Sequence, residues 1–220
     1  MLLAPLLLLV PQTPPAAQAQ QPTPAAQEPA PRAHAPLPPP PVWSTSLSTY
    51  WIEPPYQSGY FSAIVTADKG PLHLEAHWAY EDRDTLSLFA GKSFPITGDI
   101  SGKITPRLGI AGGDSQGLIP AVNLALDWKK LSFYTDFEYM IGLSSDTSDF
   151  LYSWSELQWA FTPRFSAGLV GQRTHVYAQD LEVDHGLMFG MALGKVRATG
   201  YFFNLDESHP YFMLAVGAGF

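Results

Sequence analysis

Short segments in which apolar and polar residues alternate follow one another from Trp43 to the end of the chain. In residues 72–80, for example, every second residue is apolar, and His73, Glu75 and His77 lie between them. A period of two is typical of β-strands that have one apolar and one polar face. The pattern therefore predicts an all-β chain.

The alternating segments are separated by turn-forming residues at a spacing of about ten residues, which suits strands that cross a membrane. Twelve strands are predicted, at residues 43–53, 58–68, 71–81, 84–94, 98–110, 117–128, 131–142, 149–161, 164–177, 183–193, 195–204 and 209–220. Every second connection is short and basic or proline-containing, such as Lys129-Lys130, whereas the others are longer and mostly acidic. Short turns at one end and longer loops at the other predict a closed antiparallel transmembrane β-barrel.

Alternation alone leaves open which face points inward, because a soluble barrel has the same period with its faces reversed. The aromatic residues of the apolar face gather near the two ends of the predicted strands. Near the short turns are Trp43, Phe94, Trp128, Phe133, Trp159, Phe161, Phe165 and Phe220, and near the loops are Trp51, Trp78, Tyr80, Tyr139, Tyr177, Phe202 and Phe212. Two aromatic belts are typical of a lipid-facing surface. We therefore expect the apolar face to point outward.

The composition agrees with a membrane location. Charged residues make up 15% of the chain, against roughly 25% in soluble domains. The net charge of −8 argues against nucleic acid as a partner, because no basic stripe is present to displace counterions from phosphates. Cysteine is absent, which excludes disulfides, thiolate metal sites and thiol nucleophiles.

The first part of the chain differs from the rest. Residues 1–19 contain a short apolar run and end at a small-x-small site, so we interpret them as a signal peptide. Residues 20–42 are rich in Pro, Ala and Gln, and 13 of the 21 prolines of the chain lie within its first 41 residues. This stretch is predicted to be a disordered periplasmic tether. Residues 43–220 form the predicted barrel.

If the apolar face meets lipid, the polar face lines the lumen. The residues predicted to line it are His73, Glu75, His77, Lys103, Arg107, Asn123, Asp127, Asp136, Glu138, Glu156, Gln158 and Arg197. Twelve strands enclose a wider interior than the eight that side chains can fill. Two readings stay open, a network of ion pairs that holds the wall together and a charge-lined narrow pore.

Metal binding along a single strand is not expected. His73 and His77 lie about 13 Å apart on an extended strand at ~3.3 Å per residue, whereas the ligands of one zinc ion lie within ~2.1 Å of the metal. The sequence therefore predicts no metal site and no cofactor.

An enzyme is a further alternative, because some outer-membrane barrels cleave lipids with a Ser and a His on the outer wall. Ser153 and Ser155 are predicted to face lipid, and His175 is the one candidate histidine. No nucleophile elbow or paired-carboxylate site is recognisable. We therefore expect no catalytic activity.

Two regions fit the strand pattern poorly. Pro106 and Pro120 lie inside predicted strands, and because proline cannot donate to a β-ladder, we expect their hairpin to be bulged or frayed. Arg173 shares its parity with the outward residues of its strand, and a bulge near Gly171 would turn it inward.

The chain ends Gly217-Ala218-Gly219-Phe220, and a terminal outward-facing Phe is typical of bacterial outer-membrane barrels. With this ending, its alternation of apolar and polar residues and its two aromatic belts, the chain resembles this class, including its twelve-stranded porin-like members. The resemblance implies insertion by the barrel-assembly machinery with Phe220 as the assembly signal, contact with outer-membrane lipid, and passive diffusion of small hydrophilic solutes. It places the protein in the outer membrane of a Gram-negative-type bacterium, with the tether and the C-terminus in the periplasm. Alternatives are a non-conducting structural or adhesin-like barrel and a lipid-modifying enzyme.

Overall fold

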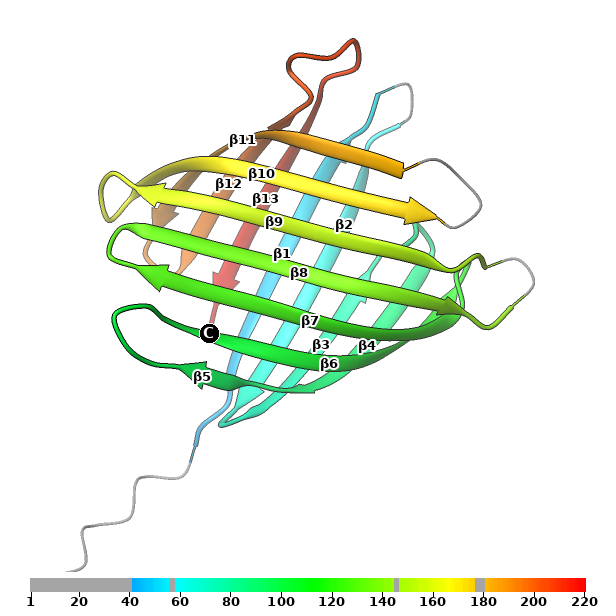
Figure 1. The fold of residues 1–220 in the computed structure, drawn as a ribbon, viewed down its shortest axis with the longest axis horizontal. Coiled ribbons are helices and arrows are strands. Elements are labelled where there is room, and N and C mark those ends of the chain that lie inside the picture. The colour runs from blue at the N-terminus through cyan, green and yellow to red at the C-terminus, as the bar shows by residue number, and fades with distance from the viewer. Residues whose placement is uncertain (1–40, 56–57, 145–146, 177–180) are drawn as a thin grey trace, which may run out of the picture. The chain divides into compact units, whose positions relative to one another are not determined.

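The computed structural model describes residues 41–55, 58–144, 147–176 and 181–220, which form thirteen strand segments in one sheet (Figure 1). The segments are β1 (Ser44–Glu53), β2 (Tyr60–Lys69), β3 (Leu72–Trp78), β4 (Thr85–Lys92), β5 (Phe94–Ile96), β6 (Ser101–Gly113), β7 (Gly117–Trp128), β8 (Leu131–Gly142), β9 (Phe150–Ala160), β10 (Phe165–Val176), β11 (Leu181–Leu193), β12 (Val196–Phe203) and β13 (Tyr211–Gly219). In this part of the chain, no helix is long and apolar enough to span a membrane. The predicted signal peptide and nearly all of the tether lie outside the described residues.

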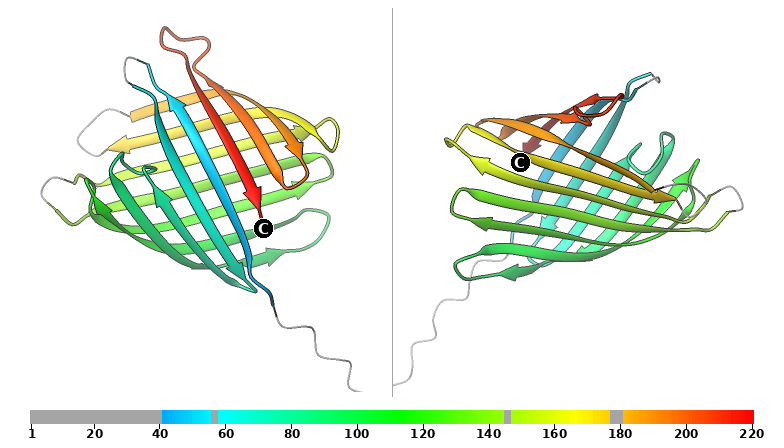
Figure 2. Two further views of the ribbon diagram at one scale, coloured as in Figure 1. Left: turned by 180° about the vertical axis from the view of Figure 1, so that it is seen from behind. Right: turned by 45° about the horizontal axis from the view of Figure 1, so that its top comes forward.

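The sheet closes on itself. The first and last strands, β1 and β13, pair antiparallel from Ser46 opposite Gly219 to Glu53 opposite Phe212, and they lie side by side in Figure 2. All other neighbouring strands are also antiparallel, and the β4–β6 pair completes the ring. The predicted closed antiparallel barrel is therefore confirmed.

The thirteen segments make twelve strands of the wall, because β4 and β5 are two parts of one strand beside β6. Their registers agree, with Gly91 opposite Arg107 and Phe94 opposite Ile104. The interruption between them lies opposite Pro106. Proline has no N–H to donate to the neighbouring strand, so the ladder is interrupted on this side.

The prolines interrupt the pairing of other strands than the pair expected. The pairing of β6 with β7 runs without interruption from Ser101 to Ala111, through both Pro106 and Pro120, so the prediction of a frayed hairpin is wrong. Pro120 instead coincides with a gap in the pairing of β7 with β8, between Leu118 and Ala121. A missing N–H weakens only the ladder toward which it would have pointed.

The pairing of β10 also differs from expectation. Its register with β9 and with β11 is continuous from Ser166 to His175, so the bulge predicted near Gly171 is absent. Arg173 is exposed as a consequence. It lies close to the end of β10, where an outward charge can reach water.

The two faces of the wall are oriented as predicted. Leu74 is 37% exposed and Phe137 is 42% exposed, whereas their neighbours Glu75 and Asp136 are 9% and 3% exposed. A soluble barrel would show the opposite arrangement. Apolar side chains cover the outside of the barrel, and polar and aromatic side chains fill the inside.

The two ends of the barrel differ, and we name them for their connections. The turn end carries the tight connections at Gly70, Lys129 and Gly194, each with a φ near +60°. Both Thr45 and the last residue, Phe220, lie there, joined by backbone hydrogen bonds of 2.8 and 3.3 Å. The loop end carries the longer connections, such as residues 79–84 and 204–210.

Most of the predicted aromatic belt at the turn end is exposed, including Trp43, Trp128, Trp159 and Phe165. Tyr177 of the other belt lies outside the described residues. Tyr80 is an exception, because its hydroxyl bonds to that of Tyr152 inside the barrel at 3.1 Å. The prediction of a lipid-facing Tyr80 is wrong because β3 ends at Trp78 and the alternation is lost at Ala79, which has a φ of 52°.

Candidate functional site

Two cavities enter the lumen from opposite ends. The larger, of about 1000 Å³, reaches the loop end at Pro54, Pro55 and Glu207. The smaller, of about 570 Å³, reaches the turn end at Lys195 and Phe220. Both cavities are lined by Thr66, Glu75 and Tyr134, so these three side chains lie between the two spaces.

Arg107 on β6 is the centre of a buried ion cluster. Its Nη1 atom donates a hydrogen bond to Glu75 on β3, and its Nη2 atom donates to Asp136 and Glu138 on β8, the latter at 2.8 Å. The guanidinium also lies over the ring of Phe89, 4.8 Å from its centroid. Charges removed from water need such partners, because their desolvation is costly. The cluster joins three strands across the interior.

Glu75 lies between two histidines of its own strand. Its carboxylate contacts the Nε2 atom of His73 at 3.1 Å and the Nε2 atom of His77 at 2.9 Å. The Nδ1 atoms of these histidines contact Asp68 and Glu81, both at 2.7 Å. The imidazoles thus lie on opposite sides of one carboxylate.

The opposite wall of the lumen is aromatic. Trp154, Tyr201 and Phe203 pack with Val170, Met188 and Met213 in one buried cluster. Glu156 lies on this wall, and one of its carboxylate oxygens accepts hydrogen bonds from Trp154 Nε1 at 2.9 Å and from the Tyr201 hydroxyl at 2.8 Å. Neutral donors therefore hold this carboxylate at the surface of the larger cavity.

Other predicted lumen residues lie nearer the turn end. Arg197 donates a hydrogen bond of 3.2 Å to Gln158, and both line the larger cavity. Lys103 and Asn123 line the smaller one. Asp127 accepts a hydrogen bond from the Ser132 hydroxyl at 2.7 Å and is exposed, and it lines neither cavity.

The structure adds lumen residues that the sequence analysis did not propose. At the loop end, Asp184 accepts hydrogen bonds from Asn204 at 2.6 Å and from Tyr211 at 3.1 Å and lines the larger cavity. Tyr50 and Tyr134 also line it. Each shares the parity of the inward residues on its strand, and this alternation is the signal in the sequence that points to them.

The outer wall holds the serines considered for an enzyme. Ser155 shares a hydrogen bond of 2.9 Å with Thr135 of β8. His185 contacts Asp206 at 2.9 Å, and its position on β11 gives it the parity of the exposed Leu187. The side chain of His175 lies outside the described residues.

Solved structures of outer-membrane channels resemble the barrel. A KdgM porin matches with a TM-score of 0.56 at 10% identity, covering 80% of this chain and 99% of the porin. A KdgM porin in complex with disordered oligogalacturonate matches with a TM-score of 0.54 at 10% identity and the same coverage. OpdQ of Pseudomonas aeruginosa matches with a TM-score of 0.43 at 9% identity, covering 77% of this chain and 57% of its own.

No family model and no curated protein matches the sequence. At 10% identity, the likeness to the KdgM porin concerns the fold alone. The chain therefore has the closed twelve-stranded barrel fold of an outer-membrane porin.

Proposed function

We propose that the chain forms a narrow passive channel across an outer membrane for small hydrophilic solutes, with a preference for cations and uncharged molecules over anions. The observation that carries the proposal is that two cavities enter from opposite ends and share the lining residues Thr66, Glu75 and Tyr134. A path lined by polar groups inside an apolar outer wall is the arrangement that lets water-soluble molecules cross a bilayer.

The charge of the larger cavity supports the preference for cations. Five acidic side chains and one arginine line it: Glu75, Asp136, Glu156, Asp184, Glu207 and Arg197. Because Glu75 and Asp136 pair with Arg107, the excess negative charge comes from Glu156, Asp184 and Glu207. A confined space lined by one sign of charge attracts the opposite sign. Oligogalacturonate, which is bound in one of the similar porins, carries a carboxylate on each sugar, and such a polyanion suits this cavity poorly.

The proposal includes an orientation in the membrane. Short turns typically face the periplasm and longer loops face outward, which puts the turn end, with Thr45 and Phe220, on the periplasmic side. The predicted tether, residues 20–42, would then lie in the periplasm. Insertion by the barrel-assembly machinery, with Phe220 as its signal, is part of the same proposal.

A second candidate is a non-conducting structural or adhesin-like barrel. The buried contacts of Arg107 with Glu75, Asp136 and Glu138 favour it, because they bind the interior together on one side. We propose no catalytic activity for either candidate.

Single-channel recording in planar bilayers separates the two candidates. Refolded protein should give conductance steps, and a salt gradient should produce a reversal potential of the sign expected for cations. Absence of conductance steps at high protein load would overturn the proposed channel function and favour the structural barrel. Conductance steps with a reversal potential of the sign expected for anions would support the channel function but overturn the proposed preference for cations.

A further inference from the structure

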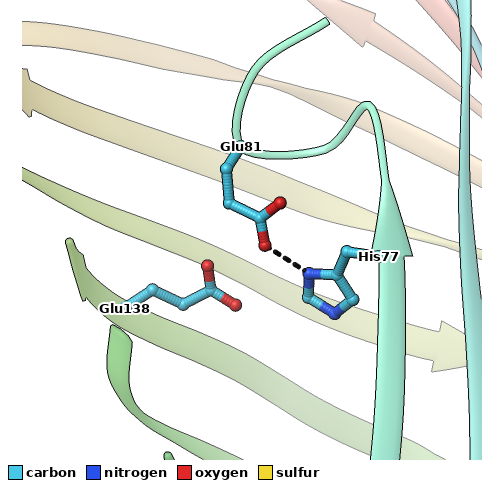
Figure 3. Close-up of side chains that lie close together, drawn as sticks. All are labelled: His77, Glu81 and Glu138. Carbon is cyan, nitrogen blue, oxygen red and sulfur yellow. Dashed lines mark hydrogen bonds and ion pairs between the residues drawn. The ribbon is translucent and has the colours of Figure 1, made fainter. Parts of the chain in front are cut away.

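Three ionisable side chains converge at the loop end of the ion cluster. His77 comes from β3, Glu81 from the connection that follows it, and Glu138 from β8 (Figure 3). The side chains of His77 and Glu81 are 0% and 1% exposed, and that of Glu138 is 1% exposed. One possible ligand atom from each lies within 4.8 Å of the others.

Two carboxylate oxygens in this group have no partner. The Oε2 atoms of Glu81 and Glu138 are buried and make no hydrogen bond within the described part of the chain. Their Oε1 atoms contact His77 Nδ1 at 2.7 Å and Arg107 Nη2 at 2.8 Å. Buried carboxylate oxygens without donors are costly, and a cation bound between them would satisfy both.

The charges of the cluster also call for a cation. Glu75, Glu81, Asp136 and Glu138 bring four negative charges when ionised, against one permanent positive charge on Arg107, and His73 and His77 add positive charge only when they are protonated. With neutral histidines, a divalent ion beside Glu81 and Glu138 would offset most of the excess.

His77 is oriented as a metal ligand would be. Its Nε2 atom lies 2.9 Å from Glu75 Oε1, so an Nε2–H can donate to this carboxylate. The Nδ1 atom faces Glu81 in Figure 3, and the 2.7 Å contact between them needs a shared proton. An ion that displaces this proton would find a lone pair on Nδ1. Histidines that bind metals commonly donate their other N–H to a carboxylate in this way.

Space for further ligands lies next to the group. A cavity of about 220 Å³ is lined by Glu81 and Glu138 together with Gln172 and Thr174. The hydroxyls of Tyr80 and Tyr152, which are joined at 3.1 Å, lie at its boundary with the larger cavity. Water in this space could complete the coordination shell of an ion held by three side chains.

We propose that His77, Glu81 and Glu138 bind a divalent transition metal ion of the Zn²⁺ type. One imidazole and two carboxylates suit this class of ion, whereas Ca²⁺ and Mg²⁺ prefer oxygen alone. Tetrahedral zinc ligands lie roughly 3.4 Å apart, so small side-chain rotations have to part His77 Nδ1 from Glu81 Oε1, which lie 2.7 Å apart, and close the wider gaps of up to 4.8 Å in the group. The ion would tie the β3–β4 connection to β8. This site does not depend on whether the lumen conducts.

The test uses the full chain without an affinity tag, refolded in detergent and stripped with a chelator. Titration with Zn²⁺ in a calorimeter should give one site per barrel, and Co²⁺ in its place should give a visible absorption spectrum with nitrogen and oxygen ligation. The variants Glu138→Gln and His77→Gln should weaken binding at least tenfold. Glu156→Gln is the matched control, because it removes a lumen carboxylate outside the group, and its affinity should equal that of the parent.

Each variant is first checked for the folded, heat-modifiable form, and Glu81→Gln, in a connection, replaces any strand variant that does not fold. Absence of Zn²⁺ binding to the folded parent would overturn the proposal, and protons would then neutralise the cluster. Equal Zn²⁺ affinity of the parent and the glutamine variants would also overturn it. Tighter binding of Ca²⁺ than of Zn²⁺ would overturn the assignment to a transition metal.

Discussion

The hydroxyl of Tyr201 on β12 donates a hydrogen bond of 2.8 Å to Glu156 on β9. The bond passes over β10 and β11, which lie between these strands in the sheet. Trp154 donates to the same oxygen at 2.9 Å. Two neutral donors thus fix the position of a carboxylate on the wall of the larger cavity without cancelling its charge.

Glu156→Gln should therefore reduce the preference of the channel for cations. Removing one charge from a confined path lowers the local potential, and we expect the cation-to-anion permeability ratio to fall at least about twofold. The reversal potential in a salt gradient measures it. Asp99→Asn, an exposed carboxylate outside the larger cavity, should leave the ratio unchanged.

Tyr134→Ala should raise the conductance, because Tyr134 lines both cavities and lies between them. Removing the ring widens the junction between them. Phe137→Ala on the same strand is the control, because Phe137 is on the outer face and its loss leaves the path unaltered. Equal single-channel conductance of Tyr134→Ala and the parent would show that solutes do not pass this junction.

Arg107→Met should destabilise the barrel by about 3–5 kcal/mol, because it leaves buried carboxylates without their cation. Glu75, Asp136 and Glu138 all lose their contact with the guanidinium. Reversible unfolding in urea in the presence of lipid measures the free energy. Arg173→Gln, at an exposed position, should change it by less than about 0.5 kcal/mol.

Leu169→Arg should destabilise the barrel by about 2–4 kcal/mol, the cost of an arginine on the lipid face near the middle of a membrane. Leu169 lies on the outer face, opposite Leu157 and Leu187 on the neighbouring strands. Leu193→Arg, beside the turn at Gly194, should cost no more than about 1 kcal/mol, since it can reach water. The free energies of unfolding of the two variants are compared in the presence of lipid. Equal losses of stability would contradict the prediction that a bilayer surrounds this wall.

Deletion of Phe220 should impair assembly in cells. Its side chain is exposed and its backbone pairs with Thr45 of β1, so it is available at the seam of the barrel. The measurement is the amount of heat-modifiable, trypsin-resistant protein in the outer membrane. Phe220→Tyr keeps an aromatic ring and should retain assembly, whereas normal levels in the deletion would refute a role as signal.

The local alternation was enough to predict the strands and their faces. Leu74 and Glu75 point to opposite sides because successive residues of any strand do so, and the aromatic residues at the strand ends indicated that the apolar side meets lipid. These features depend on near neighbours in the chain, and the sequence displays them directly.

The departures arise where a single residue changes the backbone. Ala79 adopts a φ of 52° after β3, which turns Tyr80 into the lumen against its parity. Pro106 lies opposite the interruption between β4 and β5, although its pairing with β7 is intact. The sequence shows that Pro106 lies inside a strand, but it does not show which neighbouring strand lacks a hydrogen bond as a result. It also does not predict the positive φ of Ala79.

The sequence by itself determined the number of strands, their faces and the acidic and aromatic content of the interior, because a strand has a period of two and lipid accepts only apolar side chains. The tertiary structure decided which interior groups meet. Arg107 contacts carboxylates 29 to 32 residues away, and Glu138 lies beside His77 and Glu81. These meetings depend on the register and closure of the barrel, which bring together side chains from strands that are not neighbours.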